Sequence, residues 1–229
     1  MESMNQLKDL LKHELNDLYS AEEQIIEALP QMIEKAKDKQ LKKTLKDHLK
    51  VTEAQRKRLD QVIKKLDEGS GEGNENGRKS KGFLSGLFSG KQVCKGVEGL
   101  IKEGQKVMSE DMEPDVMDAA IIASTQKIEH YEIAAYGTVR AWAEQIGLKD
   151  VEKLLKATLE EEYEADTLLN ELALGRLNIE AIHEGEEEQT ERKTTAKNQA
   201  NSSSNKKSAG SGNKKKSGTR TRSRARAKA

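Results

Sequence analysis

Four glutamates occupy positions where a helical pattern calls for an apolar residue. Leu11, Leu15, Leu18, Ile25, Leu29 and Met32 recur at spacings of four and three, and Glu22 fills the position between Leu18 and Ile25. Glu129 and Glu132 interrupt the apolar face of a later segment in the same way, and Glu162 interrupts that of the last one. Because a buried carboxylate without a partner is costly, these acids must share protons, cations or a metal.

Carboxylates that point inward from facing helices build dinuclear metal sites in helical bundles. Iron and manganese accept carboxylate and imidazole ligands. His48 shares a helix face with Leu41 and Leu45, and Glu53 lies at the flank of that face. Asp166 follows Glu162 by four residues and so lies on the same face. We therefore predict a dinuclear Fe or Mn site with these candidate ligands: Glu22, Glu53, Glu129, Glu132, Glu162, Asp166 and His48.

Two alternatives to this site stay open. The acids could pair with Lys or Arg, or face solvent if the assumed helical register is one residue off. A di-iron bundle also usually carries Glu-x-x-His on two helices. This chain has Lys50-x-x-Glu53 and Glu160-x-x-Tyr163 at the corresponding places, which leaves di-iron oxidase chemistry open.

The elements that must position these acids are all helical. Apolar spacing predicts helices over 4–37, 40–67, 93–109, 113–145 and 149–176. Two tight hairpins separated by a long crossover predict an all-α, ferritin-like four-helix bundle with a short extra helix in the crossover. We expect a helical domain over 1–184, with a Gly-rich linker at 68–92 inside the crossover, and a disordered Lys/Arg/Ser-rich tail over 185–229.

The tail is strongly basic although the whole chain has a formal net charge of zero. Residues 192–229 contain thirteen Lys or Arg and no acid, so residues 1–191 carry 27 bases against 40 acids, a net charge of −13. A flexible cationic segment can neutralise phosphates, which predicts nonspecific DNA binding through residues 192–229. The alternative is that the tail solubilises the protein or folds back on the acidic body.

Several segments resemble the YciE/YciF group, bacterial ferritin-like proteins associated with stress responses. The resemblance spans about residues 4–180, and its most specific part is the Glu-His-Tyr-Glu-Ile-Ala string at 129–134. The segments Leu15–Glu22, Ala28–Pro30 and His48–Leu49 also match, as does Thr158–Glu162 followed by Asp166. The resemblance implies a four-helix ferritin-like fold and a homodimer, and it leaves activity undefined.

We expect a cytoplasmic protein with no membrane association. Its one cysteine, Cys94, excludes an intramolecular disulfide framework, and no apolar run approaches membrane-spanning length. The predicted function is that of a ferritin-like stress-response protein that binds iron or another divalent metal. It is expected not to be a conventional enzyme, with ferroxidase-type activity as the catalytic alternative. The competing hypothesis is a non-enzymatic dimeric scaffold or nucleoid-associated stress protein without a functional metal site.

Overall fold

The computed structural model describes residues 4–68 and 92–182, and the described residues are helical apart from short connections. The helices are α1 (Leu7–Lys35), α2 (Lys39–Glu68), α4 (Lys95–Val107), α5 (Pro114–Gln145) and α6 (Lys149–Leu172). A π-helical stretch, η1 (Ala173–Leu177), follows α6, and α-helix resumes to residue 182. The chain divides into two units, Met1–Gly185 and Glu186–Ala229, and the linker 69–91 and the basic tail lie outside the described residues.

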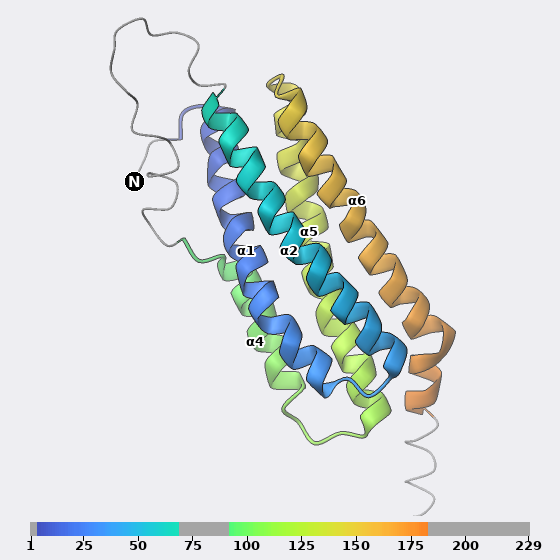
Figure 1. The fold of residues 1–229 in the computed structure, drawn as a ribbon. Coiled ribbons are helices and arrows are strands. Elements are labelled where there is room, and N and C mark those ends of the chain that lie inside the picture. Colours follow the sequence, from blue (N-terminus) through green and yellow to red (C-terminus); the bar gives the residue numbers. More distant parts are fainter. Residues whose placement is uncertain (1–3, 69–91, 183–229) are drawn as a thin grey trace, which may run out of the picture. The chain divides into compact units, whose positions relative to one another are not determined.

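The four long helices form a bundle of two antiparallel hairpins, as Figure 1 shows. α1 packs on α2 and α5 packs on α6, while α2 also contacts α6 and α1 contacts α5. The short helix α4 lies outside this bundle against α1 and α5 (Figure 1). This arrangement confirms the expected four-helix, ferritin-like topology with one extra helix in the crossover.

The turn between α1 and α2 is fixed by a buried acid on α5. Asp118 accepts hydrogen bonds from the backbone N–H groups of Lys37 and Asp38 at 2.7 and 2.8 Å. Asp38 in turn accepts from the backbone of Gln40 and Leu41, which caps the start of α2. The first helix therefore ends two residues before its predicted end at 37, and the second begins one residue before its predicted start at 40, because the backbone donors of the turn find their acceptors here.

The turn between α5 and α6 depends on Gly147. Its φ of 80° lies in the left-handed region that glycine adopts without a side-chain clash. The N–H of Gly147 bonds the carbonyl of Glu144, and the N–H of Leu148 bonds that of Ala143, which satisfies the last turn of α5. Gly147 therefore ends the helix.

The crossover helix α4 is anchored to α1 through Cys94. The backbone N–H of Cys94 donates to Ser20 Oγ at 3.1 Å, and its carbonyl accepts from the amide of Gln24 at 3.1 Å. Its thiol lies 3.1 Å from the Tyr131 hydroxyl of α5 and accepts from the N–H of Val97. Cys94 is thus a buried packing residue that also caps α4.

Two apolar clusters fill the bundle, and a polar layer lies between them on every long helix. One cluster includes Leu11, Leu15 and Leu18 of α1 with residues from the neighbouring ends of the other helices. The other includes Ile25, Leu29 and Met32 of α1 with residues from the opposite ends. None of the helices in the described ranges combines the length and apolar content that a bilayer crossing requires.

Candidate metal centre

The polar layer consists of side chains that the four long helices direct into the core. Each is at most 9% exposed, and the four glutamates are 0–1% exposed. The members are Glu22 of α1; His48, Thr52 and Gln55 of α2; Glu129 and Glu132 of α5; and Thr158 and Glu162 of α6. The apolar residues before and after them on each helix hold them at this depth, because they set which face of the helix is buried.

Helical spacing explains how α5 supplies two acids. Glu129 and Glu132 are three residues apart, so both lie on the buried face of α5. Glu22 occupies the corresponding face of α1, and Glu162 that of α6. The facing helices therefore bring four carboxyl groups and one imidazole into a single layer, as the sequence pattern predicted.

The donor atoms form two overlapping groups. His48, Glu129 and Glu162 each offer one ligand atom, and these three atoms lie within 4.8 Å of one another. Glu22, Glu132 and Glu162 form a second group that meets the same limit. Glu162 belongs to both groups, which is the arrangement expected of a carboxylate that bridges two cations.

A few neutral donors contact the carboxylates. The Tyr136 hydroxyl donates to Glu22 Oε1 from within the buried face of α5. The Gln55 amide donates to Glu162 Oε1 at 2.5 Å and to Glu161 Oε2 at 3.1 Å.

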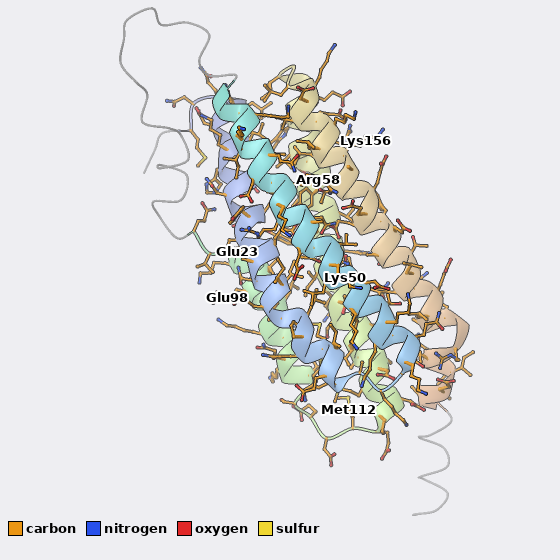
Figure 2. The ribbon with its side chains drawn as sticks, viewed as in Figure 1. Glu23, Lys50, Arg58, Glu98, Met112 and Lys156 are labelled. Atoms are coloured by element: carbon orange, nitrogen blue, oxygen red, sulfur yellow. The ribbon has the colours of Figure 1, made fainter. Side chains whose placement is uncertain are left out.

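The bonds to Glu161 extend to the surface through Arg58. Arg58, labelled on α2 in Figure 2, donates to both oxygens of Glu161 at 2.7 and 2.8 Å. It also donates to Thr158 Oγ1 at 2.7 Å. Glu161 therefore neutralises most of the charge of Arg58 near the edge of the bundle, because both of its oxygens accept hydrogen bonds from this guanidinium.

Several oxygens in the layer have no hydrogen-bond partner among the described residues. They are Glu22 Oε2, Gln55 Oε1, Glu132 Oε1, Glu162 Oε2 and both carboxyl oxygens of Glu129. His48 Nε2 lies 3.1 Å from Glu129 Oε1, an ion-pair distance, but without hydrogen-bond alignment. Buried polar atoms are almost always bonded, so this concentration of unsatisfied acceptors indicates a site for a cation or protons.

Burial controls the protonation of the cluster. It raises the pKa of Glu22 to about 8, although the Tyr136 hydrogen bond opposes the shift. Burial and the neighbouring carboxylates raise the pKa values of Glu132 and Glu162 well above the ordinary value of 4.5. Burial lowers the pKa of His48, but the facing charges of Glu129 and Glu22 outweigh it and raise the pKa above 6.5. At neutral pH the layer therefore holds protons that a cation would displace.

The remaining sequence candidates lie outside this layer. Glu53 is exposed on α2. Asp166 is partly buried, and its Oδ1 accepts from Gln126 at 2.9 Å and lies 3.2 Å from His130 Nε2. His130 is exposed on α5. The structure thus brings together Glu22, His48, Glu129, Glu132 and Glu162 and separates Glu53 and Asp166 from them.

Sequence reasoning assigned no role to Gln55, Arg58 or Glu161. Gln55 could have been found, because it interrupts the apolar face of its helix between Thr52 and Leu59 as the glutamates do on theirs. Arg58 and Glu161 carry no such signal, since they lie at the edge of the buried face and their pairing joins α2 to α6.

Comparisons with family models and with curated proteins assign the chain to the same family. A family model described as a domain of unknown function, DUF892, matches residues 6–79 and 86–182. Protein YciF of Escherichia coli strain K12 is 37% identical over 179 residues, which covers 78% of this chain and 97% of the relative.

Solved structures agree with that result. YcfI from Rhodopseudomonas palustris is 42% identical with a TM-score of 0.63, and the match covers 76% of this chain and 99% of the other. The crystal structure of the E. coli stress protein YciF is 36% identical, with the same TM-score and the same coverage. With its helical topology and buried acidic layer, the chain belongs to the DUF892 family and is a relative of the E. coli stress protein YciF.

Proposed function

We propose that the bundle binds a pair of divalent cations, iron or manganese, in the polar layer. One ion would be held by His48, Glu129 and Glu162, and the other by Glu22, Glu132 and Glu162. Four carboxylates and one imidazole form an oxygen-rich donor set, which suits these metals better than thiolate-rich sites do. Bound metal would supply Lewis-acid or redox chemistry, and the protein's part is to hold the ligands in a dry, preformed layer.

The observation that carries this proposal is the group of unsatisfied acceptors in the core. Both oxygens of Glu129 are fully buried and lack hydrogen-bond donors among the described residues. A buried carboxylate retained for structure alone would be expected to meet an Arg, a Lys or backbone N–H groups. Asp118 meets two backbone N–H groups in this way, so the same bundle provides the comparison.

The test is a pair of isosteric variants with metal analysis after anaerobic Fe²⁺ or Mn²⁺ loading. Glu129→Gln should lose bound metal because it removes a charged ligand at an unsatisfied position. Glu53→Gln removes an exposed glutamate from α2 and should retain the wild-type stoichiometry. The proposal fails if wild-type protein holds no stoichiometric metal, or if Glu129→Gln holds as much as Glu53→Gln does.

A stability measurement separates a metal site from a structural one. Removing the charge of Glu129 should leave the metal-free protein as stable as wild type, or more stable, because its buried carboxylate has only His48 at ion-pair distance and lies in one layer with three other glutamates. If Glu129 were instead a structural partner of His48, Glu129→Gln should destabilise the protein. Urea unfolding of both metal-free proteins at pH 8 distinguishes these results.

We further propose that residues 192–229 bind nucleic acid without sequence preference, as their thirteen cations and lack of acids suggest. A mobility-shift titration should show that a chain ending at residue 185 binds duplex DNA far more weakly than the full chain at low salt. Equal binding by the two forms would contradict this. If the tail instead folds back on the acidic body, full-chain binding should be weak at low salt as well.

The homodimer implied by the family resemblance is a separate proposal. Sedimentation equilibrium of the full chain and of the form ending at residue 185 should give twice the monomer mass for both. A monomer mass for the shorter form would assign association to the tail rather than to the bundle.

A further inference from the structure

A pocket of about 450 Å³ opens between α2 and α6 and ends at the polar layer. Its inner lining includes His48 and Thr125, which are 9% and 1% exposed. Thr125 lies one helical turn before Glu129 on α5. The pocket therefore reaches an imidazole whose Nε2 lies 3.1 Å from Glu129 Oε1.

His48 is the member of the two donor groups that meets this pocket. The four glutamates of those groups are 0–1% exposed and do not line it. His48 Nε2 also lacks a hydrogen-bond partner among the described residues. A nine-tenths buried imidazole, with Glu129 at ion-pair distance, thus stands between the pocket and the carboxylates.

Three carboxylates and one ammonium line the outer part of the pocket, those of Asp47, Glu161, Glu164 and Lys43. Asp47 pairs with Lys43 and Lys50, each at 2.8 Å, and Glu161 pairs with Arg58 at 2.7 Å. Within the described ranges, Glu164 has no cationic partner at ion-pair distance. Its uncompensated negative charge in the outer part of the pocket attracts cations.

We propose that this α2–α6 pocket is the route by which divalent cations enter and leave the buried layer, with Glu164 drawing them in and His48 as the first ligand reached. This inference rests on the proposed metal-binding function. Figure 2 shows this side of the bundle, with Lys50 and Arg58 labelled on α2 and Lys156 on α6. The proposal assigns the exchange of the ion to one face of the molecule and to named residues.

The experiment follows Co²⁺ exchange by the full chain. Protein loaded with Co²⁺ is mixed with an excess of a chromogenic chelator, and the rate of release is recorded. Ala165 lines the pocket from α6, so Ala165→Trp should obstruct the route. Asn170→Trp places the same side chain at an exposed α6 position that does not line this pocket.

Ala165→Trp should retain the wild-type Co²⁺ stoichiometry but release the ion more slowly, by about tenfold or more, because a bulky side chain restricts access. Asn170→Trp should release Co²⁺ at the wild-type rate. A wild-type rate in a folded, loaded Ala165→Trp protein would overturn the proposal. Wild-type protein that binds no Co²⁺ would instead refute the metal-binding function on which the proposal rests.

A variant that removes one charge tests the proposed route independently if the Ala165→Trp protein does not fold. Glu164→Gln should lower the Co²⁺ association rate at low ionic strength and weaken its dependence on salt. Glu160→Gln, at another exposed glutamate of α6 that does not line the pocket, is the matched control. Equal association rates for the two variants over the salt range would overturn the route through the pocket.

Discussion

Cation binding should expel protons from the polar layer, because buried carboxyl groups hold protons there in the metal-free protein. Burial raises the pKa of Glu22 to about 8, so this group is protonated at pH 6.5, and burial also raises the pKa values of Glu132 and Glu162 well above 4.5. Each must ionise to act as a ligand. We therefore expect release of at least one proton per pair of ions at pH 6.5, from Glu22, with further contributions from Glu132, Glu162 and His48, whose pKa values are also raised.

Isothermal titration calorimetry in buffers of different ionisation enthalpy measures this number directly. The apparent affinity should also rise steeply from pH 6 to pH 7.5, by about tenfold per pH unit for each proton released. Glu53→Gln is the control and should release the same number of protons, because its carboxyl group is exposed. Binding with no proton release at pH 6.5 would show that the buried carboxyls are ionised without metal, and would refute this reasoning.

Three further predictions concern the folded state. The unfolding free energy of metal-free protein should fall from pH 6 to pH 8.5. Glu22 binds its proton more tightly in the folded protein, with a pKa of about 8 against an ordinary 4.5, and this contribution to stability is lost as pH rises through 8. Urea titrations that give equal stability at both pH values would contradict this prediction. Asp118→Asn should lower the free energy of unfolding in urea by about 1–3 kcal/mol, since it leaves a backbone donor of the α1–α2 turn without its acceptor. The control, Asp115→Asn, affects one longer contact to Lys37 and should lower the free energy of unfolding less. Gly147→Ala should lower stability by about 1 kcal/mol because alanine is strained at a φ of 80°, and an unchanged thermal midpoint would argue against that turn geometry.

Local periodicity was sufficient to predict the helices and the buried acids. The apolar spacing of Leu11, Leu15 and Leu18 fixes which face of α1 is buried, and Glu22 shares that face whatever the helix packs against. The same periodicity predicted that Glu129, Glu132 and Glu162 are buried. A long crossover between two short hairpin turns was sufficient to predict the bundle topology. Helix ends were predicted less closely because they depend on distant acceptors, as Asp118 shows at the α1–α2 turn.

Which polar residues belong to the candidate metal site depended on the tertiary structure. Glu53 and His48 are both polar residues in the middle of α2, yet the packing of α2 against α1 and α6 places His48 beside Glu129 of α5 and leaves Glu53 exposed. Asp166 shares a helix with Glu162, but one further turn brings it to His130 at the surface. The amino-acid sequence by itself therefore determined that a helical bundle buries four carboxylates. Only the relative placement of the helices decided that these acids form two groups sharing Glu162, one of them with His48, and that a pocket between α2 and α6 reaches His48. The physical reason is that contacts between helices are not encoded in the periodicity of any one helix.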